Sequence, residues 1–429
     1  MTEYLKQAPL YSERVNDEVR RTVGEMLADI RRDGEQAIRA YSRRLDDWDP
    51  ESFLVDEATI ARASRELDTE LAAHIAFAQE QVRKFATAQR QTLTDLEVET
   101  LPGVTLGHRH IPVGTVGSYV PGGRYPLLAS AFMTVIVPKV AGVERVIACA
   151  PPQRGQGVHP VMLHAMAGSG ADQILCLGGV QALAALAFGI EGLEPADMIV
   201  GAGNAYVAEA KRQLFGEVGI DLLAGPTEIA IIADGSADPE LVATDLLGQA
   251  EHGPNSPAVL IALDRALGAE VIAAVERQLV DWPTREVAAA AWEAHGSVAV
   301  VEDRAAAVAL SDRIAPEHLE VQVDPAELPA YLAELRNYGS LFLGDQATVA
   351  YGDKAVGTNH VLPTMRAARY TGGLWVGKFL RTCTYQELTE EGTRRVAPAV
   401  EAIAGAERMQ GHALTATRRL EALGEVATR

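Results

Sequence analysis

Hydrophobic positions in the first part of the chain follow a helical period. Between about residues 17 and 91, apolar residues recur at spacings of three and four, as at Val23, Met26 and Ile30. This spacing places apolar side chains on one face of each helix. No strand pattern is evident before about Val104, so we expect the chain to begin with a helical part.

After Ile111 the pattern changes to short β-rich runs that alternate with segments of helical length. A first block predicts strands at 113–120, 145–149, 173–177, 197–200 and 220–223. A second block predicts strands at 228–233, 258–262, 298–301, 319–323 and 340–343. Such alternation is typical of a parallel sheet with helices on both faces. The sequence therefore predicts two doubly wound, Rossmann-like α/β units, which could be related halves.

The same pattern suggests domain boundaries. We expect an N-terminal extension over 1–19 and a discontinuous α/β domain built from 20–118 and 228–374. A second α/β domain, over 119–227, is expected to bind a nucleotide. The charged segment 375–429 shows helical spacing and no strand to pair, which predicts a helical C-terminal tail. Ligands of such folds bind at the carboxyl ends of the strands, where we expect the polar clusters of both blocks to meet.

Composition narrows the class of partner. Among 429 residues, 38 are basic and 58 are acidic, so the formal net charge is −20. This charge argues against nucleic acid or an anionic membrane as the principal partner and favours a small-molecule substrate. The longest apolar stretch runs from Leu127 only to Lys139, too short to span a membrane, and the N-terminus lacks a signal-peptide core. We expect a cytoplasmic protein.

Three cysteines form no CxxC pair. Cys149 and Cys176 lie inside apolar, strand-like runs, whereas Cys383 lies near the tail. Small apolar surroundings favour buried free thiols in a reducing compartment. A catalytic thiol is therefore not expected.

One candidate metal site begins at the end of a predicted helix that Asp238 caps. Gln249 and His252 are three residues apart, one helical turn, just before Gly253-Pro254. This spacing could direct an amide oxygen and an imidazole at one cation. Alternatively, His252 could only offset the negative end of the helix dipole.

Two further polar clusters follow in the second block. Glu317 and His318 come directly after Pro316 and before a predicted strand. A histidine is the natural base near neutral pH, and a neighbouring glutamate could hold a water, although a salt-bridged turn would have the same sequence. Asp353 and His360 lie in a glycine-bearing segment that is either an unused turn or a ligand site.

The usual dinucleotide fingerprint is missing. Gly201-Ala-Gly203 supplies its first two glycines, but Tyr206 stands where the third belongs. Glycine pairs also follow two other predicted strands, at Gly122-Gly123 and Gly178-Gly179. Three glycine-bearing loops at three strand ends of one sheet are what a bound nucleotide would need.

Taken in order, seven motifs between about residues 20 and 420 resemble the histidinol dehydrogenase family. They are Tyr119-Val-Pro-Gly-Gly123, Gly178-Gly-Val-Gln181, Gly201-Ala-Gly-Asn204, Ala224-Gly-Pro-Thr-Glu228, Gln249-Ala-Glu-His252, Ala315-Pro-Glu-His318 and Gly352-Asp353 with Gly357-Thr-Asn-His360. The resemblance implies a homodimeric enzyme that uses zinc and two NAD⁺ to oxidise a primary alcohol through an aldehyde to a carboxylate. This is a four-electron oxidation.

The resemblance also implies roles for individual residues. The implied zinc ligands are Gln249, His252, Asp353 and His412, the last donated by the partner subunit's tail, although a lone histidine there could simply be surface. The implied acid/base pair is Glu317 and His318. The positions implied to contact the nucleotide are Tyr119, Gln181 and Asn204, and those near the substrate are Thr227, His360 and Glu407.

The implied chemistry agrees with the residue types. A ligand set of nitrogen and oxygen atoms without thiolate suits zinc that stays accessible to substrate. His318 is expected to take the hydroxyl proton as hydride leaves, and Glu317 to activate the water that hydrates the aldehyde. A catalytically silent binding homologue is the second interpretation, disfavoured because the acid/base and ligand residues are all present.

Three segments depart from the usual family pattern. They are Arg124-Tyr125-Pro126-Leu127-Leu128, Gly352-Asp353-Lys354 and Tyr370 to Lys378. These variants are similar to a branch that oxidises 2,3-dihydroxypropane-1-sulfonate to sulfolactate. Arg124 or Lys354 could balance a sulfonate, but both could instead face water or the NAD phosphates. We therefore expect a small anionic diol as substrate, with L-histidinol, giving L-histidine, as the alternative.

Overall fold

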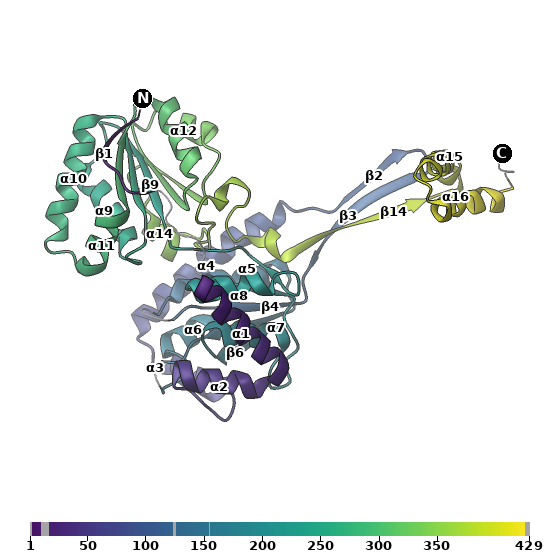
Figure 1. The fold of residues 1–429 in the computed structure, drawn as a ribbon, viewed down its shortest axis with the longest axis horizontal. Coiled ribbons are helices and arrows are strands. Elements are labelled where there is room, and N and C mark those ends of the chain that lie inside the picture. Colours follow the sequence, from purple (N-terminus) through teal and green to yellow (C-terminus); the bar gives the residue numbers. More distant parts are fainter. Residues whose placement is uncertain (1, 10–16, 123–125, 154, 425–429) are drawn as a thin grey trace. The chain divides into compact units, whose positions relative to one another are not determined.

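The computed structural model describes residues 2–9, 17–122, 126–153 and 155–424 (Figure 1). The chain forms a larger unit, Met1–Gln89 with Val113–Lys378, and a smaller unit, Arg90–Pro112 with Phe379–Arg429. The larger unit confirms the predicted mixed α/β fold with parallel sheets. No helix in the described ranges is long and apolar enough to cross a membrane.

A five-stranded parallel sheet forms the first α/β block. Its strands, in chain order, are β4 (Thr115–Tyr119), β5 (Arg145–Ala150), β6 (Gln173–Cys176), β7 (Met198–Val200) and β8 (Gly219–Ile220). The intervening helices are α5 (Leu128–Ala141), α6 (Pro160–Gly168), α7 (Gly179–Phe188) and α8 (Ala205–Leu214). In space the strands lie in the order β6-β5-β4-β7-β8, so the winding direction reverses between β4 and β7.

A six-stranded sheet forms the second block with the same winding. Its parallel strands are β9 (Ile229–Ala233), β10 (Ala258–Ala262), β11 (Gly296–Val300), β12 (His318–Gln322) and β13 (Ser340–Leu343). The helices are α9 (Pro239–Ala250), α10 (Arg265–Leu279), α11 (Arg285–His295), α12 (Arg304–Ile314), α13 (Leu328–Glu334) and α14 (Val349–Lys354). The order β11-β10-β9-β12-β13 reverses between β9 and β12, and β1 (Glu3–Lys6) adds an antiparallel edge. A shared strand order is what a duplicated unit would give.

The predicted N-terminal helical part comprises four helices. They are α1 (Asp17–Asp33), α2 (Glu35–Asp46), α3 (Glu57–Glu66) and α4 (Thr69–Gln91). The predicted boundaries group this part with the second block, but α1 packs against α7 and α8, and α3 packs against α6. The reason is that the apolar face of α1, which includes Val23 and Ile30, joins the core of the five-stranded sheet. Both sheets belong to one compact unit, so the division into two domains stays a prediction.

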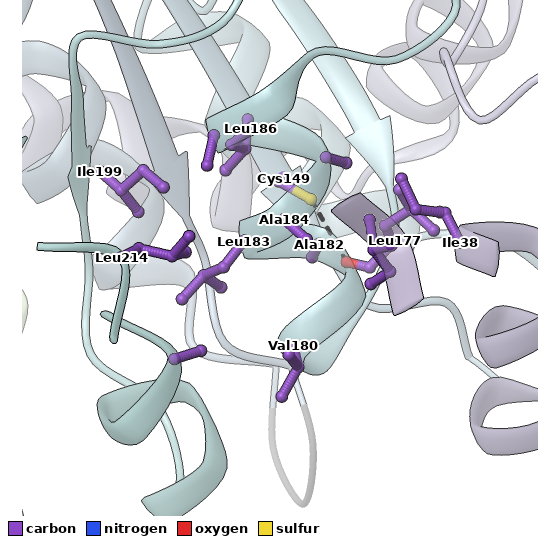
Figure 2. Packing of buried hydrophobic residues seen from close by; sticks show 14 of the residues in the cluster. Ile38, Cys149, Leu177, Val180, Ala182, Leu183, Ala184, Leu186, Ile199 and Leu214 are labelled. Carbon is purple, nitrogen blue, oxygen red and sulfur yellow. Dashed lines mark hydrogen bonds between the residues drawn. The ribbon is translucent and has the colours of Figure 1, made fainter. Parts of the chain in front are cut away.

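Figure 2 shows part of this core, in which side chains of α7 such as Leu183 and Leu186 surround Cys149 of β5. The Cys149 thiol donates a hydrogen bond to the Leu177 carbonyl oxygen at 3.3 Å. Burial raises the pKa of Cys149 and raises that of Cys176 to about 12, so neither thiol forms a nucleophilic thiolate near neutral pH. The prediction of buried, unpaired cysteines is confirmed for these two. Cys383 is free and half-buried.

The smaller unit contains a strand that the sequence pattern does not reveal. β2 (Leu96–Leu101), β3 (Val104–Pro112) and β14 (Leu380–Leu388) form an antiparallel sheet in the order β14-β3-β2. The helices α15 (Glu390–Ala406) and α16 (Gln410–Ala422) pack together. The prediction that the tail has no strand to pair is therefore wrong. Most of β14 is exposed, so no alternation of buried apolar residues marks it in the sequence.

Gly201 follows β7 and permits the closest backbone approach in the glycine loops. Its φ is +112°, and a Cβ atom there would lie 2.1 Å from the Tyr119 carbonyl oxygen. We expect Gly201→Ala to lower the free energy of unfolding by about 1–3 kcal/mol more than a substitution that meets only backbone strain. Denaturant titration of the purified variant measures this loss.

Gly216 provides the matched control, because its φ is +103° and a Cβ atom added there would meet no other atom within 4 Å. Gly216→Ala should cost about 1 kcal/mol, from backbone strain alone. Equal losses for the two variants would show that the contact with Tyr119 does not constrain this loop.

Candidate functional site

A cavity of about 860 Å³ in the larger unit collects most of the predicted site residues. The five-stranded block contributes Tyr119, the glycine pair Gly178-Gly179, Gln181 and Asn204 to its wall. The six-stranded block contributes Thr227, His252, Glu317, His318, Asp353, Lys354 and His360. Polar groups that are far apart in the chain thus face one space.

The two sheets present opposite edges to this cavity. In the five-stranded sheet, Tyr119 ends β4 and the loop at Gly178 follows β6, so the predicted carboxyl edge is used. In the six-stranded sheet, His318 begins β12 and Thr227 precedes β9, so the amino edge is used. The expectation of carboxyl ends in both blocks is therefore wrong for the second. The helices α9 and α14 follow their strands and return to that amino edge, which is why their last turns carry site residues.

His318 is held in one orientation by the backbone of the neighbouring strand. Its Nδ1 lies 3.0 Å from the Glu228 carbonyl oxygen, which can only accept, so Nδ1 must carry the proton. This bond leaves Nε2 with a free lone pair when the ring is neutral. Nε2 is buried without a hydrogen-bond partner among the described residues, and Asp353 Oδ1 is 3.7 Å away, beyond hydrogen-bond distance. The atom is available to a ligand.

Glu317 lies beside this histidine and is held by the strand that precedes it in space. Its Oε2 accepts hydrogen bonds from Thr227 Oγ1 at 2.6 Å and from the Glu228 backbone nitrogen at 3.0 Å. The same oxygen is 3.5 Å from His318 Nδ1. Burial raises the pKa of Glu317, which makes the carboxylate a stronger proton acceptor. Burial and the charge of Glu317 also raise the pKa of Glu228, to about 8.

The histidine is correspondingly basic. Burial opposes its charging, but the negative charges of Glu317 and Asp353 outweigh burial and raise the pKa of His318 to about 9. The three groups therefore form one coupled proton-holding cluster. Such a cluster can accept a proton from a bound molecule or return one to it.

Gln249, His252 and Asp353 line one wall of an adjoining cavity, so the structure brings the three together. The amide nitrogen of Gln249 donates to Thr227 Oγ1, which leaves its amide oxygen as a donor atom for a cation. His252 Nδ1 lies 3.2 Å from the Gln249 carbonyl oxygen, which fixes the proton there and leaves Nε2 free. These are the donor atoms that an accessible zinc site uses.

Their protonation states also fit a cation. Burial lowers the pKa of His252, so its imidazole is neutral at neutral pH. Burial opposes ionisation of Asp353, but its contact with His318 and the charges of His360 and Lys354 lower its pKa to about 2. Among the described residues no group of three His, Cys, Asp or Glu side chains could hold a metal, because the third donor here is an amide. His412, in the first turn of α16, and Glu407, just after α15, belong to the smaller unit and are exposed.

His360 and Lys354 complete the polar wall. His360 Nε2 lies 2.9 Å from Ser130 Oγ, and its Nδ1 lies 3.2 Å from the Asp353 carbonyl oxygen. The Lys354 side chain is exposed at the rim and forms no hydrogen bond or ion pair within the part of the chain that is described. An unpaired cation at the rim can receive an anionic group. Arg124, the other predicted cation, lies outside the described residues.

The predicted nucleotide-contacting residues hold the glycine loops in place. The Tyr119 hydroxyl accepts a hydrogen bond from the Gly179 nitrogen at 3.2 Å. Asn204 caps α8, since its Oδ1 accepts from the Val207 nitrogen at 3.1 Å. The buried Gln181 donates to Asp46 Oδ2 at 2.8 Å, while its amide oxygen has no partner among the described residues. That oxygen is free to accept from a ligand.

A buried ion pair fixes the third loop. Lys211 donates to the Gly201 carbonyl oxygen at 2.9 Å, and Asp221 accepts from the Gly201 nitrogen at 2.8 Å. Lys211 and Asp221 also pair with each other. Both backbone groups of Gly201 are therefore satisfied without a ligand, so the loop keeps its shape when the cavity is empty.

Three residues of the site were missed by reasoning from the sequence. Glu228 orients His318, Ser130 holds His360, and Asp46 holds Gln181. Glu228 directly follows Thr227 in a recognised motif, which was the available signal. Asp46 gave no signal, since it ends a helix 135 positions before its partner.

The chain was compared with known proteins. Residues 11–420 match the family model described as histidinol dehydrogenase. A histidinol dehydrogenase homolog from Shouchella clausii is 51% identical over 99% of this chain and 100% of its own length. A sulfopropanediol 3-dehydrogenase from Ruegeria pomeroyi is 49% identical over 97% of this chain and 96% of its own. The crystal structure of histidinol dehydrogenase from Elizabethkingia anophelis superposes with a TM-score of 0.91 at 32% identity, covering 98% and 95% of the two chains.

Proposed function

The chain belongs to the histidinol dehydrogenase family, whose members are oxidoreductases acting on alcohol groups, and we propose that it oxidises a primary alcohol to a carboxylate with zinc and two NAD⁺. One observation carries the proposal. The buried acid/base pair Glu317 and His318 faces the same cavity as three glycine loops that end the strands of a parallel sheet.

The strand order supports the site for NAD. Numbered along the chain, the five-stranded sheet has the Rossmann-like order 3-2-1-4-5, and dinucleotides bind where such an order reverses, here between β4 and β7. Every parallel strand of the other sheet is followed by an acid at its carboxyl end: Asp234, Asp264, Asp303, Asp324 and Asp345. These carboxylates would repel the phosphates of a dinucleotide. We therefore assign one NAD site, used twice.

The first oxidation follows from the orientation of His318. The Glu228 carbonyl holds the Nδ1 proton, so Nε2 takes the hydroxyl proton of the alcohol while hydride passes from the same carbon to nicotinamide. Gln249, His252 and Asp353 would hold the zinc, with His412 of the partner subunit. Zinc would supply positive charge that lowers the pKa of a nearby hydroxyl and favours neutral imidazoles.

The second oxidation uses the neighbouring carboxylate. Glu317, raised in pKa by burial, removes a proton from the water that adds to the aldehyde, and the resulting hydrate loses a second hydride. The balance is one alcohol, one water and two NAD⁺ giving one carboxylate, two NADH and three protons. Cys149 and Cys176 are buried away from this chemistry, so no thioester forms.

For the substrate we propose a small anionic diol such as 2,3-dihydroxypropane-1-sulfonate, with L-histidinol as the alternative. The exposed, unpaired Lys354 at the rim supplies a cation for a sulfonate. Histidinol carries its own positive charge and would be repelled by the same lysine. The sulfopropanediol 3-dehydrogenase relative supports this choice.

A homodimer that exchanges its C-terminal tails completes the proposal. The core of the smaller unit's two helices is limited to Ala397, Ala416 and Leu420, with Val400 against them, too little to stabilise an independent unit. The same unit exposes the apolar side chains Leu96, Val98, Ile403, Met409 and Leu414. Such surface is normally covered by a partner. With this partner, we propose, the enzyme works in the cytoplasm.

The reaction is tested by incubating the purified protein with NAD⁺ and each alcohol. We expect two NADH for each molecule of 2,3-dihydroxypropane-1-sulfonate, loss of activity on metal chelation, and recovery with Zn²⁺. Absorbance at the NADH band and mass spectrometry of the acid measure both products. Turnover of histidinol alone would refute the sulfonate assignment, and no oxidation of either alcohol would refute the proposed function.

Lys354 tests how the substrate is recognised. We expect Lys354→Gln to raise KM for the sulfonate diol about tenfold, equivalent to one charge-assisted contact, with kcat changed less than about threefold. Steady-state kinetics measure both constants. Lys139→Gln is the control, because Lys139 is paired with Asp172 and lies outside the cavity wall. An unchanged KM for Lys354→Gln would remove Lys354 from the binding site.

Tail exchange is tested by complementation between two inactive chains. Homodimers of His252→Ala and of His412→Ala should each lack zinc and activity. Because one chain supplies His252 and its partner supplies His412, the mixed dimer would contain one intact site and recover about half the zinc and activity per dimer. Differently tagged chains allow the mixed dimer to be isolated. A mixed dimer without bound zinc would contradict the exchange.

A further inference from the structure

Two buried carboxyl groups lie together in the six-stranded block, on the elements that carry the site. They belong to Glu320 on β12 and Asp245 on α9. The amide nitrogen of Gln322 donates to both, at 3.0 Å to Glu320 Oε2 and at 2.9 Å to Asp245 Oδ2. The Glu320 side chain is fully buried.

The same two acids bind the first turn of α14. Glu320 Oε1 accepts a hydrogen bond from the Val349 backbone nitrogen at 3.0 Å. Asp245 Oδ1 accepts from Thr348 Oγ1 at 2.9 Å. A helix of only six residues has little stability of its own, so these bonds matter to its position.

No lysine or arginine in the described ranges forms an ion pair with either acid. Two carboxylates so close cannot both stay ionised, so the pair shares one proton. Burial, together with the charge of Asp245, raises the pKa of Glu320 to about 8, which keeps this proton bound at neutral pH. The pair therefore acts as a hydrogen-bonded unit rather than as two repelling charges.

Each contact lies one structural period from a site residue. Glu320 is two residues after His318, on the same face of β12. Asp245 is one helical turn before Gln249 on α9. Val349 is one turn before Asp353 on α14. The network thus ties together three elements directly beneath His318, Gln249 and Asp353.

We propose that Glu320 and Asp245 are positioning residues that set the spacing of Gln249, His318 and Asp353 and thereby control how tightly the site retains its metal. Neither acid touches the substrate. The inference rests on the proposed function, since it assumes that a zinc ion binds among these side chains. Partners behind metal ligands typically change metal affinity by 10- to 100-fold when removed.

The test measures zinc affinity by competition with a chromophoric chelator, alongside kcat and thermal stability. We expect Glu320→Ala to weaken zinc binding about 10- to 100-fold. Glu320→Gln keeps the volume, accepts from the Val349 nitrogen and donates to Asp245, so it should stay within about threefold of the unmodified protein. Thr348→Val, a milder change that removes one hydrogen bond, should weaken zinc binding by about threefold to tenfold.

Asp312→Ala is the matched control. Asp312 accepts from the backbone nitrogens of Arg336 and Asn337, at 3.0 and 2.9 Å, in the same block but not on an element of the site. Its removal should lower thermal stability and leave zinc affinity unchanged. The proposal is overturned if Glu320→Ala and Thr348→Val lose stability as this control does and still bind zinc normally. An unmodified protein that binds no zinc would instead refute the proposed function.

Discussion

The hydrogen bond between His318 Nδ1 and the Glu228 carbonyl oxygen is the interaction on which the site depends. It exists because β9 and β12 pair in parallel at the reversal point of the six-stranded sheet, with His318 in register with Ile229. A backbone carbonyl cannot donate, so this bond fixes the tautomer and orientation of the ring at once. The same adjacency lets Thr227 and the Glu228 nitrogen hold Glu317. One strand pairing therefore positions both members of the acid/base pair.

The structure uses one strand order for two purposes. In the five-stranded sheet the carboxyl edge carries glycine loops, and Lys211 with Asp221 fixes the loop at Gly201 before any ligand binds. In the six-stranded sheet the carboxyl edge is acidic, and the amino edge, reached by the returning helices α9 and α14, carries the reactive side chains. Separation of binding and chemistry between two similar blocks follows from which edge of each faces the cavity.

Negative charge is concentrated beneath the cavity. Glu228, Glu317, Glu320 and Asp353 are buried, and within the described residues none forms an ion pair with lysine or arginine. Burying charge without compensation is costly, so the cluster retains protons on some acids and favours a cation beside Asp353. The excess of carboxylates that raises the pKa of His318 is thus the same feature that makes the site suitable for a divalent ion.

The sequence by itself determined the helices and strands of the two α/β blocks, because each element has a local period that its own residues display. It also identified Glu317, His318, Gln249, His252 and Asp353, since these belong to short motifs. Only the tertiary structure decided that β14 is a strand, that Asp46 meets Gln181, and that the amino edge of the second sheet faces the cavity. These features are pairings between distant segments, and their energy comes from contacts that no local pattern records.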